Sequence, residues 1–400
     1  MRLNIAPRAA NLEYAIRDIV VEAKKIEKTT SEKMIYLNIG DPIAYDWKTP
    51  EHMRKALAEA TEEGYNGYSP SLGLQELREA IVEKEKRVAG ADIDIDHIIV
   101  TAGVSESIEF LLGSLILNGN EFLIPGPSYP PYISYTYFFG GKPVSYRMIE
   151  EENWKPDIDD LRKKINDKTI AILVITPNNP TGAAIDEKTM KAMIDLAGEY
   201  ELPLISDEIY DMMTFSGKHV SAARLAKDVP IIGFNGISKV YLAPGWRIGW
   251  TYFQDPEGKL APLKDAMERQ ARVRICTNTV AQKAAIAALK GPQDHIKKTL
   301  EELKKRRDYI YKRLNAIDGI STTLPDAAFY IMPKIDLKGK WKDDKDFVLS
   351  VLKEEKIVFV NGSGFDPEYG AGHFRSVYLP PINMLEEAMD RLERFMKKHY

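Results

Sequence analysis

The sequence predicts an α/β fold in two parts: a large domain with a mostly parallel sheet flanked by helices, and a smaller α+β domain built from both chain ends. Two observations predict it. Between residues 97 and 234 short apolar runs alternate with segments of helical periodicity, and the flanking regions lack this alternation. A length of 400 residues also exceeds what one small core usually holds, so two domains are expected.

The strands expected in the large domain are short, continuous and rich in Ile, Val and Leu, as strands buried on both faces are. They are predicted at residues 97–101, 121–125, 143–148, 170–176, 203–206 and 231–234. Helices are expected between them, from about Ser105 and over 157–165 and 186–200. Because parallel strands need long crossover connections, this alternation indicates a mostly parallel sheet.

The regions on either side of this alternating block have a different pattern. Thr49 and Pro50 look like an N-cap followed by proline at the first helical position, with the helix ending near Gly64. The remaining elements are expected as a charged helix at 294–317, strands at 328–335 and 357–361, and a terminal helix from Met384. We place the large domain at 46–300, and the small domain, with an N-terminal arm, at 1–45 and 301–400.

Composition excludes several classes of function. A hydrophobic content of 44% with 28% charged residues is typical of an ordinary globular protein. The net charge of -4 gives no basic field, so we expect no nucleic acid and no membrane as partner. A single cysteine, Cys276, and the lack of an N-terminal apolar run predict a cytoplasmic protein. Six scattered histidines show no metal-ligand spacing, so no metal is expected.

The run from Gly236 to Gly249, GISKVYLAPGWRIG, follows the last predicted strand of the large domain. Lys239 leaves that buried strand, and Arg247 follows eight residues later. Such an amine can form a Schiff base with a cofactor aldehyde, and the arginine can hold the cofactor's phosphate. The alternative is a lysine and an arginine in an ordinary surface loop, which the glycines and apolar surroundings disfavour.

This run resembles the lysine motif of the class I/II aminotransferases, which are fold type I pyridoxal-phosphate enzymes. Further family motifs follow in the expected order over nearly the whole chain. Three runs resemble archaeal alanine aminotransferases in particular: LEYAIRD at 12–18, LNIGDP at 37–42 and PGPSYPPY at 125–132. The resemblance implies an aminotransferase that uses pyridoxal 5′-phosphate, with L-alanine and 2-oxoglutarate as the expected amino acid and 2-oxo acid.

The resemblance also implies how the cofactor is held. Asp207 would keep the pyridine nitrogen protonated, so that the ring withdraws electrons. Tyr210 and Asn179, the latter in the PNNPTG run, would hydrogen-bond the 3′-oxygen, and Tyr129 would stack on the ring. The implied catalytic residues are Lys239, Asp207 and Tyr210.

The phosphate site is implied by a turn that begins a helix, where backbone amides bind anions well. Its expected members are Gly103, Val104 and Ser105, with Arg247. The family often has serine three residues before the lysine, and this chain has Gly236 there. We expect Ser238 to supply the missing hydroxyl.

Substrate contacts are implied for Arg375, as a bidentate clamp on the α-carboxylate, and for Gly40 and Asn179. Arg8 and Arg17 are candidates for the distal carboxylate of 2-oxoglutarate, although exposed or structural arginines are the alternative. Tyr68, in the YSPSLGL run, matches the segment that reaches the neighbouring subunit's phosphate. Asn278 lies in a second segment, which contacts the partner's site in relatives. The resemblance therefore implies a homodimer with shared active sites.

Other functions remain open at this stage. A β-lyase or a decarboxylating synthase of the same fold would keep every cofactor residue. An aminotransferase preferring aspartate or aromatic amino acids is a further alternative, because Tyr14, Tyr129 and Tyr132 are able to line a larger apolar pocket. A transcription regulator would need a DNA-binding extension, and a nucleotide-binding protein would need the Gly-x-Gly-x-x-Gly turn that the chain lacks after its first strand.

Overall fold

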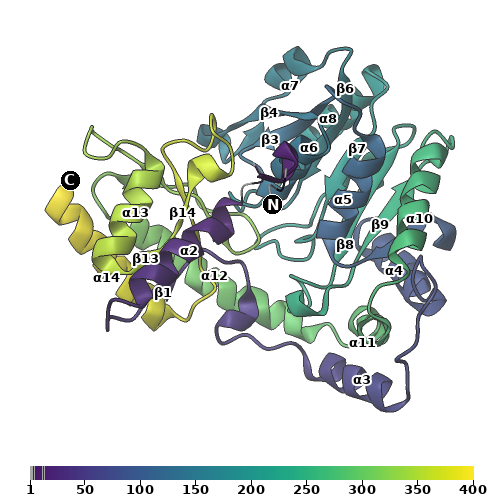
Figure 1. Ribbon diagram of the computed structural model, residues 1–400, viewed down its shortest axis with the longest axis horizontal. Coiled ribbons are helices and arrows are strands. Elements are labelled where there is room, and N and C mark those ends of the chain that lie inside the picture. The colour runs from purple at the N-terminus through teal and green to yellow at the C-terminus, as the bar shows by residue number, and fades with distance from the viewer. Residues whose placement is uncertain (1–2, 4, 11, 13) are drawn as a thin grey trace.

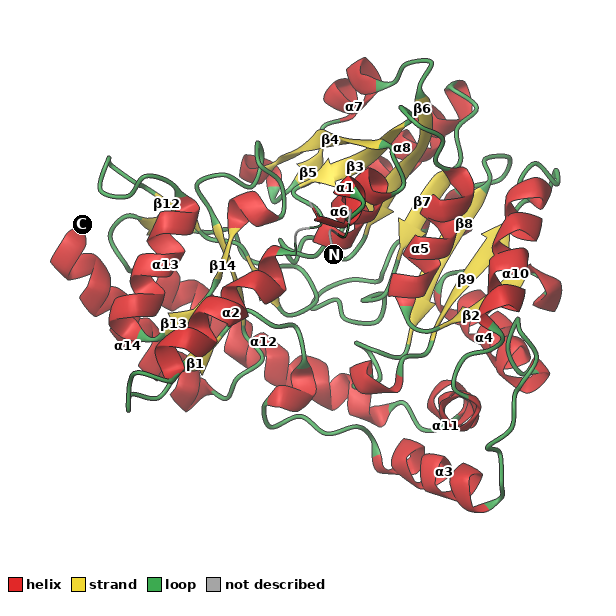
Figure 2. Ribbon diagram, in the orientation of Figure 1, coloured by secondary structure: helices red, strands yellow, loops and turns green. Residues whose placement is uncertain are grey.

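The computed structural model describes residues 3, 5–10, 12 and 14–400. Glu13, in the run at 12–18, lies outside the described residues, as do positions 1, 2, 4 and 11 of the expected N-terminal arm. Figures 1 and 2 show a large sheet with helices on both sides, and beside it a group of short strands and helices. The predicted α/β fold class is confirmed.

The large sheet has eight strands in the order β2-β9-β8-β7-β6-β3-β4-β5. Neighbours from β8 to β4 run parallel, whereas β9 is antiparallel to both β8 and β2, and β5 is antiparallel to β4. The expectation of a mostly parallel sheet therefore holds at its centre, and the sheet is mixed at its two ends. Its strands are β2 (Ile98–Thr101), β3 (Glu121–Gly126), β4 (Lys142–Ile149), β5 (Lys155–Pro156), β6 (Thr169–Ile175), β7 (Leu204–Asp207), β8 (Ile231–Gly236) and β9 (Gly249–Gln254).

Helices bury both faces of this sheet. On β6, Leu173 joins one core, with residues of α5, α6 and α10, and Ile172 joins the other, with residues of α4, α7, α8 and α11. Successive strand residues point to opposite faces, so both of them must be apolar. The helices of this part are α3 (Glu51–Glu62), α4 (Gln75–Val88), α5 (Val104–Leu115), α6 (Pro130–Phe138), α7 (Ile158–Lys164), α8 (Glu187–Glu199), α9 (Ala222–Leu225), α10 (Ala261–Arg274) and α11 (Thr279–Lys290).

The smaller part joins the two ends of the chain. β1 (Ile35–Tyr36) pairs in parallel with β13 (Ile357–Val358), so the purple and yellow-green segments of Figure 1 lie side by side. A second sheet has the order β11-β15-β14, and a third pairs β10 with β12. The remaining elements are α1 (Pro7–Ala10), α2 (Ala15–Glu27), α12 (Asp294–Leu314), β10 (Ile320–Ser321), β11 (Tyr330–Ile331), β12 (Lys334–Ile335), α13 (Asp344–Glu355), β14 (Val360–Asn361), β15 (Phe374–Val377) and α14 (Ile382–His399).

Several predicted boundaries differ from the structure. Pro50, not Thr49, occupies the N-cap position of α3, which has no side-chain capping bond. The Thr49 hydroxyl donates to the Leu242 carbonyl at 2.5 Å. The strand expected at 328–335 is divided into β11 and β12, and that at 357–361 into β13 and β14. The helix expected at 294–317 ends at Leu314. No helix in the described part of the chain is long and apolar enough to span a bilayer.

Candidate active site

A cavity of about 620 Å³ lies where the central strands of the large sheet end. The segments that follow β2, β6, β7 and β8 contribute Val104, Asn179, Ile209 and Lys239 to its wall. Open α/β sheets bind ligands at the carboxyl ends of their strands, and cavities of this size hold small molecules. The small part supplies the opposite wall, including Arg375.

Lys239 places an amine in this cavity. Its Nζ donates to the Gly40 carbonyl at 2.7 Å and lies 5.8 Å from the centre of the Phe329 ring. Burial, together with the positive charges of Arg375 and Arg247, lowers the pKa of Lys239 to about 8, against an opposing effect of Asp41. The amine is therefore much more readily deprotonated than an ordinary lysine, which suits a nucleophile or a base.

Asp207, the last residue of β7, faces the same cavity. Burial raises the pKa of Asp207 to about 6, while hydrogen bonds from the Tyr132 hydroxyl at 2.7 Å and the Ile209 amide at 3.3 Å favour the ionised form. A carboxylate held in this way can stabilise a cation on a ligand. Tyr210 lies in the turn that follows, and burial raises its pKa, so its phenol stays neutral.

A basic corner of the cavity forms where α5 begins. Arg247, in a left-handed backbone conformation with φ of 56°, donates to the Ala102 carbonyl at 3.0 Å and reaches the Ser105 hydroxyl at 3.5 Å. Gly103 has a φ of +77°, and a Cβ there would lie 2.5 Å from the Arg247 guanidinium, so only glycine fits. The first turn of a helix offers amide N–H groups without intrahelical partners, so this corner is built for an anion.

Arg375 in β15 is fully buried, at 1% exposure. Its guanidinium donates to the Asn179 side-chain oxygen at 2.8 Å and to the Asn38 carbonyl, and it lies 4.7 Å from the ring centres of both Tyr330 and Phe365. Its Nε has no hydrogen-bond partner within the described part of the chain. A buried cation without a carboxylate partner is costly unless a ligand supplies one.

The beginning of α2 closes the cavity from the N-terminal side. Tyr14 and Tyr129 line the wall with their hydroxyls 3.3 Å apart, and Arg17 lines it as well. Arg17 is exposed, and no described residue forms an ion pair with it. Arg8 does not line the cavity and lies 5.8 Å from the centre of the Phe138 ring.

The structure brings nearly all the residues implied by the resemblance together. Those that line the cavity are Gly40, Val104, Ser105, Tyr129, Asn179, Asp207, Tyr210, Ser238, Lys239, Arg247 and Arg375. Gly103 stands directly behind Arg247. Tyr68 lies apart from this group, with 84% of its surface exposed, and Asn278 caps α11 by accepting from the Ala281 amide. Tyr132 is not part of the wall, because its hydroxyl is buried against Asp207.

Asp41 and Tyr330 also line the cavity, and neither residue was predicted from the sequence to have a role there. Asp41 directly follows Gly40 in the LNIGDP run, and this position already indicated that it lies near the substrate. Tyr330 belongs to a two-residue strand that ends at Ile331, too short for strand periodicity to be recognised. The pairing of β11 with β15 sets Tyr330 opposite Val377, and the Tyr330 ring centre lies 4.7 Å from the Arg375 guanidinium.

Comparisons with known proteins agree with this geometry. The profile of the family described as aminotransferase class I and II matches residues 32–392. A solved structure of an alanine aminotransferase from Pyrococcus furiosus is 58% identical, with a TM-score of 0.96 over 99% of this chain and 100% of that one. The glutamate-pyruvate aminotransferase of Haemophilus influenzae is 34% identical over 99% of this chain and 100% of its own. An aromatic-amino-acid aminotransferase of Thermococcus litoralis is 36% identical over 92% of each chain.

Proposed function

The chain belongs to the class I and II aminotransferases, and on that basis we propose that it transfers an amino group between L-alanine and 2-oxoglutarate with pyridoxal 5′-phosphate as its cofactor. The observation that carries this proposal is the single cavity shared by Lys239, Asp207 and Arg375. Lys239 offers an amine and Asp207 a carboxylate. Arg375 offers a buried guanidinium whose Nε lacks a hydrogen-bond partner among the described residues. An amino acid with an α-carboxylate satisfies that guanidinium.

The residues present fit the cofactor. The corner formed by Gly103, Val104, Ser105 and Arg247 suits a phosphate, and Ser238 lines the cavity close to Lys239. Asp207 is available to the ring nitrogen, Asn179 and Tyr210 to the 3′-oxygen, and the Tyr129 ring to a face of the pyridine. A side chain at position 103 would displace the Arg247 guanidinium from this corner, so the phosphate site requires glycine there.

The mechanism assigns a separate task to each residue. When bound, the cofactor withdraws electrons from the substrate α-carbon. The Arg375 guanidinium binds the substrate α-carboxylate and orients the bond between the α-carbon and its hydrogen. The Lys239 amine removes the proton from that α-carbon, and its pKa of about 8 leaves much of it neutral near that pH. Asp207 keeps a proton on the ring nitrogen by its negative charge.

The substrate pair rests on similarity to the named relatives and on Arg17. Alanine needs only the α-carboxylate clamp, whereas 2-oxoglutarate carries a second carboxylate. Three arginines line the cavity, and none of them forms an ion pair within the described part of the chain. Because Arg247 is assigned to the phosphate and Arg375 to the α-carboxylate, Arg17 is the one left for that distal group. An aromatic preference is the second candidate, supported by Tyr14, Tyr129 and Tyr135 on the wall and by the similarity to the Thermococcus enzyme.

Steady-state kinetics test the proposal directly. We expect kcat/KM with 2-oxoglutarate to be higher for alanine than for aspartate, phenylalanine or tyrosine. If phenylalanine or aspartate exceeds alanine by about tenfold, or ~1.4 kcal/mol, the substrate assignment is wrong and the family assignment stands. Turnover that releases ammonia without a 2-oxo acid indicates a β-lyase instead.

Arg17→Gln tests the distal contact separately. Loss of a charge-assisted hydrogen bond should raise the KM for 2-oxoglutarate roughly tenfold and leave the KM for pyruvate in the reverse reaction within about twofold. Arg8→Gln is the matched control, and we expect it to change neither value. Equal increases for 2-oxoglutarate and pyruvate would show that Arg17 has a general structural role.

We further propose that the enzyme works as a homodimer in the cytoplasm. The free Cys276 fits a reducing compartment. The exposed Tyr68 fits a role on the phosphate of a neighbouring subunit, because its side chain does not reach the cavity of its own chain.

A further inference from the structure

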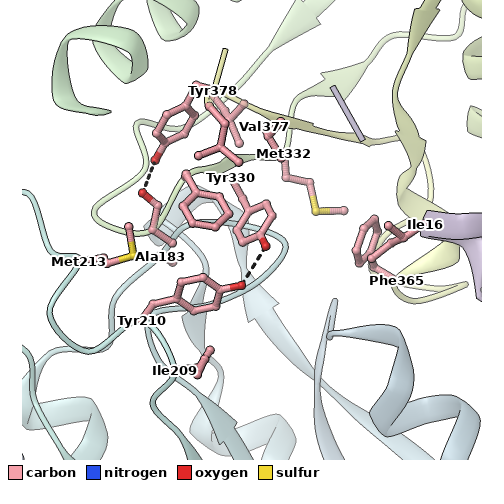
Figure 3. Packing of buried hydrophobic residues seen from close by; sticks show 14 of the residues in the cluster. Ile16, Ala183, Ile209, Tyr210, Met213, Tyr330, Met332, Phe365, Val377 and Tyr378 are labelled. Carbon is pink, nitrogen blue, oxygen red and sulfur yellow. Dashed lines mark hydrogen bonds between the residues drawn. The ribbon is translucent and has the colours of Figure 1, made fainter. Parts of the chain in front are cut away.

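Tyr330 occupies a central place among the proposed catalytic groups. It is 2% exposed, lines the cavity, and is held by the pairing of β11 with β15, opposite Val377. Figure 3 shows its side chain pointing toward Tyr210, which comes from the large part of the molecule. Tyr330 therefore connects the small part to the turn that follows β7.

The Tyr330 hydroxyl has two close neighbours. It lies 2.8 Å from the Tyr210 hydroxyl, and it packs so tightly on Gly40 that a Cβ there would be 2.1 Å away. The carbonyl of Gly40 accepts from the Lys239 amine. Each neutral phenol has one proton to donate. If one of these two hydroxyls donates to the other, the proton of the accepting hydroxyl is free for a third group.

The Tyr330 ring has a different contact. Its centre lies 4.7 Å from the Arg375 guanidinium, which the Phe365 ring approaches at the same distance. A desolvated guanidinium near aromatic rings is stabilised by cation–π attraction, and the rings also restrict its orientation. The hydroxyl and the ring of Tyr330 thus meet two different functional groups.

Resting on the proposed aminotransferase function, we propose that Tyr330 is a positioning residue with two separable tasks. Its hydroxyl donates to the Tyr210 hydroxyl, which directs the Tyr210 proton toward the 3′-oxygen of the cofactor. Its ring holds the Arg375 guanidinium in the orientation that receives the substrate α-carboxylate. No covalent step involves Tyr330.

Two substitutions separate the tasks in the cofactor-loaded enzyme. Tyr330→Phe removes the hydroxyl and keeps the ring, so kcat should fall about five- to tenfold while the KM for alanine stays within about twofold. A weaker donor to the 3′-oxygen should also raise the apparent pKa of the visible absorption band by about half a unit to one unit. Tyr330→Leu removes both groups and should in addition weaken binding of propionate, an unreactive carboxylate, roughly tenfold.

Tyr378→Phe is the matched control. Tyr378 is fully buried in the same core (Figure 3), and its hydroxyl donates to the Ala327 and Ala328 carbonyls at 3.3 Å. Tyr378 is not among the residues that line the cavity. We expect Tyr378→Phe to keep the wild-type kinetics and titration. If Tyr330→Phe behaves as this control does, or if Tyr330→Leu binds propionate as wild type does, the proposal is wrong.

The same measurements separate this proposal from the proposed function. A wild-type enzyme that transfers no amino group refutes the function, whatever the variants do. An active wild type with unchanged Tyr330 variants refutes only the positioning role. Tyr330→Phe removes a single oxygen atom, so the hydroxyl test remains decisive even if Tyr330→Leu fails to fold.

Discussion

Lys239 shows how burial tunes a single amine. Its pKa is lowered to about 8 because the ammonium form loses hydration in the cavity wall and faces two arginines. In the unfolded chain the same group has its ordinary value of 10.5. Between these values the unfolded chain binds more protons, so this residue makes stability rise with pH. At neutral pH the folded, cofactor-free protein therefore carries an unfavourable charge.

Lys239→Met should consequently stabilise the cofactor-free protein. We expect a higher Tm than wild type at pH 7, and an advantage that shrinks as pH rises from 8 to 10.5. Differential scanning calorimetry at several pH values measures it. Lys188→Met, at an exposed position in α8, is the control and should show no such dependence. A Tm difference that is constant with pH would contradict the pKa argument.

Helix α4 supports the active site from behind through a buried ion pair. Lys84 contacts the carboxylates of Asp211 and Glu85, the latter at 3.0 Å, and all three side chains are essentially fully buried. Asp211 also accepts from Asn235 in β8 at 2.9 Å. Because Asp211 lies in the turn after β7, the ion pair connects α4 to the strand that ends at Asp207 and to β8, which leads to Lys239.

Replacing Lys84 should destabilise the fold strongly. Lys84→Met leaves two buried carboxylates without a cation, which typically costs about 3–5 kcal/mol. Urea unfolding should show this loss at pH 8, and a smaller loss at pH 6, because burial raises the pKa of Glu85 to about 7 and protonation removes its charge. The exposed Lys86→Met, on the same helix, should change stability by less than about 0.5 kcal/mol. An equal effect of both substitutions would contradict the role of the ion pair.

Elements with strong local patterns were predictable from the sequence, and those defined by distant partners were not. β6 is a continuous apolar run, and α8 begins with Asp186 accepting from the Thr189 amide, so both fell within a residue of their predicted bounds. β9 was missed because its sequence GWTYFQ begins within the lysine motif and no α-helix separates it from β8. β11 exists only through its pairing with β15.

At the scale of the whole molecule, the cavity needs both parts of the chain. The cavity residues from the large sheet were predicted from motifs that follow its strands. Parallel strands end at one edge of a sheet, so these motifs were expected to lie together. The position of Arg375 opposite them required the tertiary fold. Tyr330 was missed because its contacts, Tyr210 and Arg375, are distant in sequence. The role of Tyr68 is a prediction about a second subunit.

Subunit mixing tests that prediction. Lys239→Ala and Tyr68→Ala each remove one member of a shared site, so both homodimers should be impaired. After subunit exchange, each heterodimer should regain one site with both residues intact. If the sites act independently, this gives about half of wild-type activity per heterodimer, or about a quarter for a fully exchanged equal mixture. Failure to regain activity, once exchange is verified by mass spectrometry of the mixed species, would count against shared sites.

The pairing of β1 with β13 constrains the order of events during synthesis. Ile35 leaves the ribosome 322 residues before its partner Ile357. At translation rates of roughly 5–20 residues per second, this interval lasts on the order of tens of seconds. Throughout it, the apolar face of α2 and the unpaired β1 have no finished partner, and the large sheet, whose last strand ends at Gln254, is synthesised before Ile357. The N-terminal segment is thus made early and paired late, and it stays accessible to chaperones over that interval.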